Sequence, residues 1–473
     1  MHTLNVDVAV IGAGTAGLVA LREIRQVTDR FVLIQDGPMG TTCARVGCMP
    51  SKVLIQTAED YHRRTALAKK GIQNADALRV DGAEVMRYVR KLRDYFTGGM
   101  IEKTLRFGDK LIRGRARFLD VHRLEVAGRI IEAKRIIIAT GSRPIVPKPW
   151  AALGNRILTS DTIFEIDTLP KSLAVIGLGV IGAELGQAMG RLGVDVVGIA
   201  RSGRIAGLSD PEVTASAVDA LSQDMTLWSG YTARITADGN TLSVSAGPYK
   251  KEVQAILVSV GRRPNVDDLG LERLGVERDD KGVPRYNPET LQVGDLPIFI
   301  AGDANAKDPI LHEAWDDGRV AGYNAVRDEL ACFKRRTPLK ITFTDPNIVL
   351  VGRRRDQLDI NSCVVGRVDF ADQGRAMIQD KNHGLLKLYA DSKSGRLLGA
   401  ELCAPAGEHL GHLLAWAIQR EMTVFDALRM PFYHPVIEEG LRSALQAMTA
   451  DIAEQPHFPE LAFCDESPTS PLS

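Results

Sequence analysis

"LNVDVAVIGAGTAG", residues 4–17, is the stretch of sequence that decides the fold class. Its apolar residues alternate over positions 4–10, as in a β-strand, and a segment with helical periodicity follows. Between strand and helix stand three glycines, Gly12, Gly14 and Gly17. Such glycines allow a tight turn, the close approach of a pyrophosphate to the backbone, and close packing of the helix on the strand. The pattern therefore predicts a βαβ unit that binds a dinucleotide at a helix N-terminus.

The same arrangement recurs in the middle of the chain at "LAVIGLGVIGAE", residues 173–184. Its glycines are Gly177, Gly179 and Gly182. In both copies a second apolar strand follows the helix and ends equally far from the first glycine, at Gln35 and at Ala200. Two such units in register predict an α/β protein with two Rossmann-like domains, one for each of two dinucleotides.

The end of each second strand bears on which dinucleotide is bound. An acidic residue there would hydrogen-bond a ribose hydroxyl, and both copies lack it. The amide of Gln35 can still reach a hydroxyl, which is compatible with a flavin dinucleotide. Ala200 is followed by Arg201 and Arg204, and guanidinium groups suit a 2′-phosphate better than a free hydroxyl. We therefore expect NADPH at the second site; the alternative is an exposed arginine loop and NADH.

Three further apolar runs end in small residues, at 135–144, 255–265 and 298–304. The first two, "RIIIATGSRP" and "AILVSVGRRPN", have the shape of strands that return from a domain. The third, "IFIAGDA", delivers Asp303 to the carboxyl edge of a sheet, where α/β proteins bind ligands. Asp303 is thus a candidate for binding a sugar or ribityl hydroxyl, with a helix N-cap as the alternative.

Length and composition exclude several classes of protein. A chain of 473 residues is too long for one core, and 45% hydrophobic with 25% charged residues is typical of a soluble, multi-domain protein. Lys plus Arg equals Asp plus Glu, at 59 each, which argues against nucleic acid or a membrane surface as partner. There is no secretion signal and no apolar stretch of about eighteen residues. We expect a cytoplasmic protein.

"GTTCARVGCMPSK", residues 40–52, places two of the six cysteines close together, at Cys43 and Cys48. A structural disulfide is disfavoured in a cytoplasmic protein, and zinc would need two more ligands that no nearby Cys or His supplies. On a helix this separation turns the two side chains away from one face, so a bond between them would distort the backbone and be readily reduced. A redox pair is favoured over a structural disulfide.

Taken together, these segments resemble the pyridine nucleotide-disulfide oxidoreductases, the family of dihydrolipoamide dehydrogenase, glutathione reductase and mercuric reductase. The resemblance rests on both glycine motifs, the Cys-x4-Cys segment, ATGSRP, GRRPN, AGDA, TDPNIVLVG and a His-Pro. It implies an FAD-binding domain at 1–149, an NAD(P)-binding domain at 150–264, a central segment at 265–338 that completes the FAD domain, and a C-terminal α+β dimerisation domain at 339–473. From about residue 455 the chain is rich in Pro and Ser, and we expect a poorly ordered tail.

The resemblance also implies roles for single residues. Cys43 and Cys48 would form the redox-active disulfide, with Cys43 exchanging with substrate and Cys48 lying against the flavin. Lys52 would lie near the flavin ring and pair with Glu184. The implied cofactor-binding residues are Gly12, Gly14, Gly17, Gln35, Thr42, Lys52, Thr140, Gly141, Ser142, Asp303, Gly177, Gly179, Gly182, Arg201, Arg204 and Gly261.

Thiol exchange needs a base, because only a thiolate attacks a disulfide. By resemblance the base is His434 of "FYHPVIEEGL", and Glu439, rather than Glu438, would hold its far nitrogen and fix the tautomer. The family architecture places this histidine opposite the cysteine pair of the other subunit. It therefore implies a homodimer with an active site shared across the interface.

The sequence thus predicts an FAD-dependent dithiol-disulfide oxidoreductase, with dihydrolipoamide dehydrogenase as the expected activity and no metal. The substrate would be a small-molecule or lipoyl-protein dithiol, and a 2-oxo acid dehydrogenase complex is the expected partner if the protein docks. The alternatives are an NADPH-dependent reductase of another disulfide and direct reduction of a quinone or oxygen. Mercuric reductases carry a C-terminal cysteine pair, whereas this tail has only Cys464.

Overall fold

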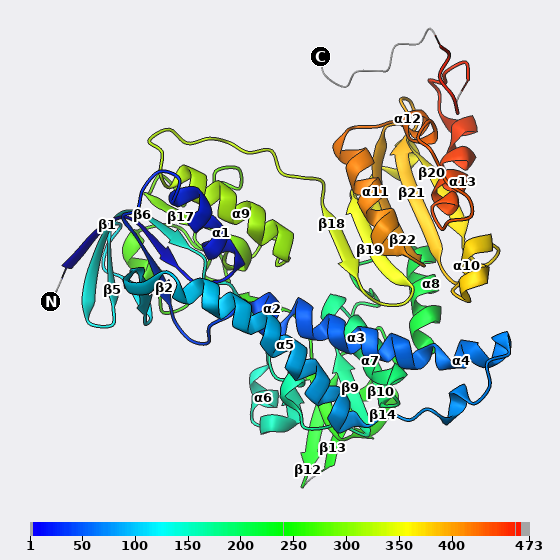
Figure 1. Ribbon diagram of the computed structural model, residues 1–473, viewed down its shortest axis with the longest axis horizontal. Coiled ribbons are helices and arrows are strands. Elements are labelled where there is room, and N and C mark those ends of the chain that lie inside the picture. The colour runs from blue at the N-terminus through cyan, green and yellow to red at the C-terminus, as the bar shows by residue number, and fades with distance from the viewer. Residues whose placement is uncertain (1–2, 240, 459, 465–473) are drawn as a thin grey trace.

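The computed structural model describes residues 3–239, 241–458 and 460–464, which form three sheet-centred parts (Figure 1). The first sheet has the order β3-β2-β1-β6-β5-β4, and β17 pairs with the end of β6. Its elements are β1 (Thr3–Ile11), α1 (Thr15–Ile24), β2 (Phe31–Gln35), β3 (Leu111–Arg113), β4 (Ala116–Phe118), β5 (Arg123–Val126), β6 (Arg129–Ile138), β17 (Ile298–Ile300) and α9 (Leu311–Asn324). The central strands are parallel and buried on both faces, as a doubly wound sheet requires.

The second sheet is entirely parallel, in the order β11-β10-β9-β15-β8. Its elements are β8 (Ile157–Leu158), β9 (Ser172–Ile176), α7 (Val180–Arg191), β10 (Asp195–Ala200), α8 (Pro211–Ser222), β11 (Thr226–Ser229) and β15 (Ala255–Val258), with a small antiparallel sheet of β12 (Arg234–Asp238), β13 (Thr241–Ala246) and β14 (Tyr249–Val253). Strand β10 ends at Ala200 and β2 ends at Gln35, as the sequence predicts. The fold class is therefore confirmed.

The chain crosses between these two parts at two neighbouring places. The segment after β6 forms β7 (Ser142–Pro144), and the segment after β15 forms β16 (Arg262–Pro264). The two short strands pair with each other in antiparallel orientation, with Arg263 opposite Arg143. The two sequence runs that resemble each other thus lie side by side.

The third part is an antiparallel sheet in the order β18-β19-β22-β21-β20. Its elements are β18 (Leu339–Thr342), β19 (Asn347–Gly352), β20 (Cys363–Asp369), α10 (Gly374–Gln379), β21 (Leu385–Asp391), β22 (Leu397–Ala404), α11 (Gly407–Gln419), α12 (Val424–Leu428) and α13 (Glu439–Met448). Successive side chains along β19 point to opposite faces of the sheet, and both faces are apolar. Val349 and Val351 share a core with α11 and α13, whereas Ile348 and Leu350 share one with the second part.

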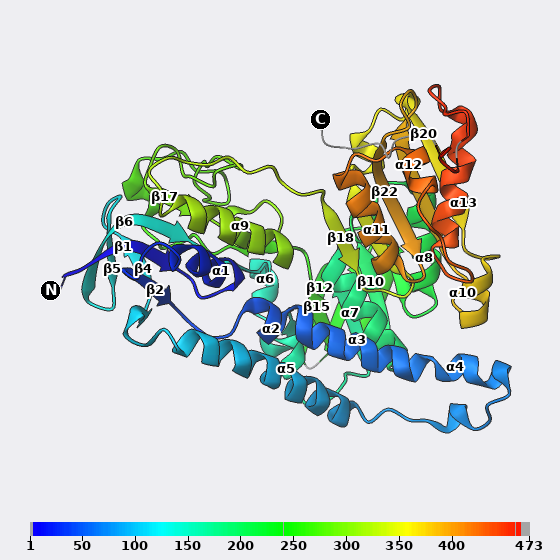
Figure 2. The same ribbon diagram turned by 45° about the horizontal axis from the view of Figure 1, so that its top comes forward.

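Helices α2 (Thr42–Val46), α3 (Cys48–His62), α4 (Arg64–Leu67) and α5 (Gly82–Leu105) connect the parts. Helix α3 packs against α5 and α7, and Figure 2 shows α3 and α5 running side by side along the lower edge of the molecule. The helical spacing of charged and apolar residues in the sequence predicts two helices here, at 53–70 and 82–105. Helix α5 has the predicted bounds. Helix α3 begins earlier than predicted, at Cys48, because Pro50 is tolerated in a first helical turn.

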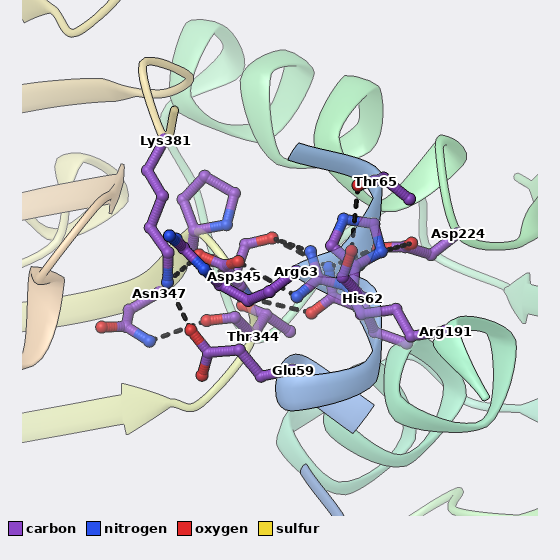
Figure 3. Close-up of polar contacts among 12 residues, drawn as sticks. Glu59, His62, Arg63, Thr65, Arg191, Asp224, Thr344, Asp345, Asn347 and Lys381 are labelled. Atoms are coloured by element: carbon purple, nitrogen blue, oxygen red, sulfur yellow. Dashed lines mark hydrogen bonds and ion pairs between the residues drawn. The ribbon is translucent and has the colours of Figure 1, made fainter. Parts of the chain in front are cut away.

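The C-terminal half of α3 lies in a polar junction with the second and third parts (Figure 3). Lys381, from the third part, pairs with Glu59 of α3 and lies 3.5 Å from Asp345. Asp345 also accepts a 3.0 Å hydrogen bond from Arg191 of α7, whose Nε lies 2.9 Å from Asp224. These contacts fix α3 against the nucleotide-binding and C-terminal parts at once.

The tail was expected to be poorly ordered from residue 455, but its described residues return to α13. Glu460 accepts hydrogen bonds of 2.8 Å from Arg442 and 2.7 Å from Gln446. The remainder of that expectation concerns residue 459 and residues 465–473, which lie outside the described residues. None of the described helices is both long enough and apolar enough to cross a membrane.

Candidate active site

The two cysteines lie on either side of a break between two helices. Thr41 caps α2, its hydroxyl accepting from the N–H of Ala44 at 3.3 Å, and Cys43 follows in the first turn. Gly47 ends α2 with φ −119° and ψ −117°, and Cys48 begins α3. The break supplies the departure from helical geometry that a contact between the two sulfurs needs.

In this structure Cys43 and Cys48 are free thiols whose side chains share a hydrogen bond. Cys43 is the donor, and that hydrogen bond is the main cause that raises the pKa of Cys43. The same bond, helped by the charge of Lys52, lowers the pKa of Cys48 to about 7. The N-terminus of α3 favours a negative charge at the same sulfur. Cys48 is therefore the thiolate of the pair near neutral pH.

Lys52 lies one turn beyond Cys48 on α3 and forms the contact with Glu184 that the resemblance implies. Its Nζ is 2.7 Å from Glu184 Oε2, and the Glu184 side chain is only 4% exposed. Glu184 also accepts a 2.9 Å hydrogen bond from the N–H of Phe343, and the Lys52 ammonium lies 4.5 Å from the centre of the Phe343 ring. A buried carboxylate and an aromatic face thus hold the ammonium group in place.

His434 and Glu439 also form the predicted contact. His434 Nδ1 lies 2.9 Å from Glu439 Oε1, and Glu439 Oε2 accepts from the N–H of Val436 at 3.1 Å. The hydrogen bond with His434 is the main cause that lowers the pKa of Glu439. With its Nδ1 held, the imidazole presents Nε2 to its surroundings, and its side chain is 81% exposed.

Within the described part of the chain, no hydrogen bond or ion pair joins His434 to Cys43 or Cys48. Figure 1 shows why: α13, which follows His434, lies on the outer side of the third part, away from the junction of α2 and α3. A single chain therefore holds the two halves of the predicted site apart.

The first glycine-rich turn has the shape that a dinucleotide needs. A Cβ on Gly12 (φ +111°) would lie 2.2 Å from the carbonyl oxygen of Ala139, and one on Gly17 would lie 1.9 Å from that of Gly12. A Cβ on Gly14, the residue before α1, would meet nothing within 4 Å. Two glycines thus serve close packing, and the third leaves the backbone open for a phosphate.

Residues around this turn also fit a bound FAD. Thr140 Oγ1 is buried without a hydrogen-bond partner among the described residues, so it remains available to a ligand. Ser142 Oγ donates to Asp303 Oδ2 at 2.6 Å, which brings two predicted cofactor residues together. Gln35 Oε1 accepts from the N–H of Ala13 at 2.8 Å, so this amide shapes the glycine turn itself.

The sequence predicts two further FAD contacts, at Gly141 and at Thr42. Gly141 has φ +72°, in the left-handed region that favours glycine, and it leads the chain out of the first sheet into β7. Thr42 is exposed at the start of α2.

The second glycine turn repeats the first. A Cβ on Gly177 would lie 2.6 Å from the carbonyl oxygen of Ser259 and one on Gly182 would lie 1.9 Å from that of Gly177, whereas Gly179 is open. Beyond β10, Arg201 is exposed, and Arg204 Nη1 lies 2.9 Å from Asp356 Oδ2 of the third part. Gly261, with φ +124°, turns the chain after β15.

Several contacts could not be predicted from the sequence, because no local pattern indicates which distant segments meet. Phe343 holds Lys52 and Glu184, and Arg262 Nε donates to Ser142 Oγ at 2.8 Å. Asp356 and the buried Glu401 contact the loop after β10 from the third part. Within the described residues no cluster of three or more His, Cys, Asp or Glu side chains could hold a metal ion.

The chain combines two dinucleotide folds with a reactive cysteine pair and a separate histidine. This combination defines a nucleotide-dependent oxidoreductase that works through thiols. Comparison with family models agrees: the model described as pyridine nucleotide-disulphide oxidoreductase matches residues 6–321, and that of the family's dimerisation domain matches residues 339–445. The chain belongs to this family. It is an FAD-dependent disulfide oxidoreductase that uses NAD(P)H, and the second match supports a homodimer.

Curated relatives carry two different activities in their names. The chain is 30% identical to dihydrolipoyl dehydrogenase of Geobacillus stearothermophilus, over 92% of this chain and 94% of that protein. It is 29% identical to mercuric reductase of Staphylococcus aureus, over 95% of this chain and 83% of that protein. Among solved structures, the Cu(II) complex of the HOCl-induced flavoprotein disulfide reductase RclA of Escherichia coli has a TM-score of 0.82 at 20% identity, covering 94% of this chain and 99% of that chain.

Proposed function

We propose that this protein is a dihydrolipoyl dehydrogenase-like enzyme that exchanges a substrate dithiol with the Cys43–Cys48 pair. The observation that carries the proposal is the contact between these two thiols at the start of α3, with the Lys52–Glu184 pair one turn away. In oxidised enzyme the two sulfurs would be bonded. Bound FAD would supply the two-electron link between this pair and the nicotinamide, held by the glycine turn, Thr140 and Asp303.

The exchange between substrate and enzyme takes place in two steps. One substrate thiolate attacks Sγ of Cys43, which breaks the bond to Cys48 and releases Cys48 as a thiolate. The second substrate thiolate then attacks the substrate sulfur bonded to Cys43, so the substrate leaves as a disulfide and the enzyme keeps two reduced sulfurs. His434 of the partner subunit accepts the proton of the first substrate thiol at Nε2, and the Glu439 carboxylate stabilises the imidazolium; the proton of the second thiol ends on the Cys43 sulfur that the second attack releases.

One observation favours a lipoyl dithiol over mercury. The C-terminal tail of this chain carries a single cysteine, Cys464, whereas mercury transfer through a tail would need a pair.

For the nicotinamide we propose NADPH. Ala200 ends β10 where an acidic residue would bind a free ribose hydroxyl, and the exposed guanidinium of Arg201 follows it. A preference for NADPH would make reduction of a disulfide the working direction. A lower KM for NADH than for NADPH would contradict this assignment.

The test is an anaerobic titration of the flavin-loaded protein with dihydrolipoamide and with each reduced nicotinamide. We expect both reductants to produce a long-wavelength band from the Cys48 thiolate beside the flavin, and Cys48→Ser to abolish dithiol-dependent turnover. If Cys48→Ser keeps that turnover, the cysteine exchange is wrong. If only turnover with a quinone or oxygen exists, and the variant retains it, the protein reduces small oxidants directly.

Membership of a 2-oxo acid dehydrogenase complex is a separate part of the proposal. It predicts that acyltransferase subunits co-purify with the native protein in stoichiometric amounts. A homodimer that purifies alone and accepts only free dihydrolipoamide would contradict it.

A further inference from the structure

The loop after β10, residues 201–210, lies against the third part of the molecule. Arg204 Nη1 is 2.9 Å from Asp356 Oδ2, and the N–H of Asp356 donates to Ser209 Oγ at 3.2 Å. Asp356 therefore contacts both the middle and the end of the loop. The resemblance implies that the adenosine end of the nicotinamide coenzyme binds at this loop. It implies no role for Asp356.

The position of Asp356 is fixed by a buried carboxylate. Glu401, in the middle of β22, is 0% exposed. It accepts hydrogen bonds from the N–H groups of Ser209 at 2.7 Å, Asp210 at 2.9 Å and Arg355 at 2.9 Å. One buried side chain thus holds the end of the loop and the residue next to Asp356, so the Arg204–Asp356 contact is built into the fold.

This contact sets the charge that the loop presents. Arg201 is exposed and makes no ion pair within the described residues, so its full charge faces solvent. Arg204 is 51% exposed but shares its charge with Asp356, which also lies 3.0 Å from Arg354. A 2′-phosphate would therefore meet one free guanidinium and one that is already paired with a carboxylate.

We propose that Asp356 is a specificity determinant for the nicotinamide coenzyme. By pairing with Arg204 it weakens the attraction of the loop for a 2′-phosphate, and it leaves the binding of a coenzyme without that phosphate unchanged. The inference rests on the proposed placement of NADPH at this loop. It assigns part of the coenzyme preference to the dimerisation domain, outside the nucleotide-binding fold.

The test is Asp356→Asn in the full-length, flavin-loaded enzyme, with KM and kcat measured for NADPH and NADH against the same disulfide. We expect the KM for NADPH to fall about two- to fivefold, the range that a partly exposed ion pair can produce, with kcat and the KM for NADH unchanged. High salt should remove the gain, because the effect is electrostatic. Asp369→Asn is the matched control, since Asp369 pairs with Arg367 elsewhere in the same domain.

Two arginine variants separate this inference from the proposed coenzyme site. If Arg201→Ala leaves the KM for NADPH unchanged, the phosphate does not bind at this loop and both proposals fail. A second outcome is that Arg201→Ala raises the KM for NADPH, whereas Asp356→Asn either has no effect or raises the KM for both coenzymes alike. In that case only the role of Asp356 is wrong. Arg204→Ala alone should raise the KM for NADPH less than Arg201→Ala does, because Arg204 is already paired; an equal rise would also contradict the inference.

Discussion

Cys48 begins a helix of 15 residues, and Lys52 stands one turn further along it. The hydrogen bond from Cys43, the helix N-terminus and the Lys52 ammonium all stabilise a negative charge on the Cys48 sulfur. Because Glu184 and Phe343 fix the ammonium in place, its contribution does not depend on a mobile side chain. The reactivity of this sulfur thus depends on residues of the second and third parts as well as on α2 and α3.

Lys52→Met should raise the pKa of Cys48 from its value of about 7. The experiment is best done in a Cys43→Ser background, where serine keeps a donor to Cys48 and only one thiol remains in the site. Since the thiolate is the reactive form above the pKa, alkylation of Cys48 by iodoacetamide should slow by up to about tenfold at neutral pH and recover at alkaline pH. Peptide-resolved mass spectrometry measures the rate, and an unchanged pH midpoint would contradict the role of Lys52.

Single-residue contacts were predictable where a motif carries them. The Lys52–Glu184 and His434–Glu439 contacts both follow from the resemblance, and both occur in the structure. Phe343 was not predictable in this way, because it lies just after β18, far along the chain, and no local pattern indicates a contact with Lys52 or Glu184.

At the scale of elements, the break between α2 and α3 brings the sulfurs together. A Cβ at Gly47 would lie 3.0 Å from the carbonyl oxygen of Thr42 and 3.1 Å from Cys43 Cα. These are backbone atoms, so they cannot rotate away. The geometry of the cysteine pair therefore depends on a residue that takes no part in the chemistry.

Gly47→Ala should displace α2 from α3 and reduce dithiol-dependent turnover by about ten- to hundredfold, because sulfur exchange tolerates little misplacement. Flavin content and the reduction of flavin by NADPH should stay close to those of the parent protein. Gly99→Ala is the matched control, since a Cβ on Gly99 of α5 meets nothing within 4 Å. Equal turnover in both variants would show that the break is not needed.

The element boundaries divide into those set locally and those set by packing. The ends of β2 and β10 and both ends of α5 follow from apolar periodicity and flanking glycines, and the sequence predicts them. The start of α3 depends on a helix break, and the docking of residue 460 on α13 depends on side chains of another element. Neither leaves a periodic pattern in the sequence, so the predicted start of α3 at residue 53 was wrong and the contacts of residue 460 were not predicted.

For the whole molecule, the important feature is that His434 lies apart from the cysteine pair of its own chain. The proposed exchange would therefore need the histidine of a second chain. His434 lies before α13 on the outer side of the third part, and its side chain is 81% exposed. The match to the family's dimerisation domain supports a homodimer, in which this face would meet a second subunit. Each proposed active site then combines the cysteines of one chain with the histidine of the other.

Mixing two inactive variants tests this arrangement. His434→Gln and Cys48→Ser should each abolish dithiol-dependent turnover in their own homodimers. After dissociation and reassociation of an equal mixture, half of the dimers are mixed, and each contains one intact site, so about a quarter of the parent activity should return. Activity that stays absent in a mixture shown to contain mixed dimers would mean that each chain forms its own site.

The pairing of β7 with β16 means that the chain enters and leaves the nicotinamide-binding part at neighbouring points. That part is therefore an insertion whose two ends meet, and a segment of a relative could be joined at the same junction by recombination. The exchange would preserve the sulfur site only if the new segment kept a carboxylate beside Lys52 and the apolar contacts with the third part.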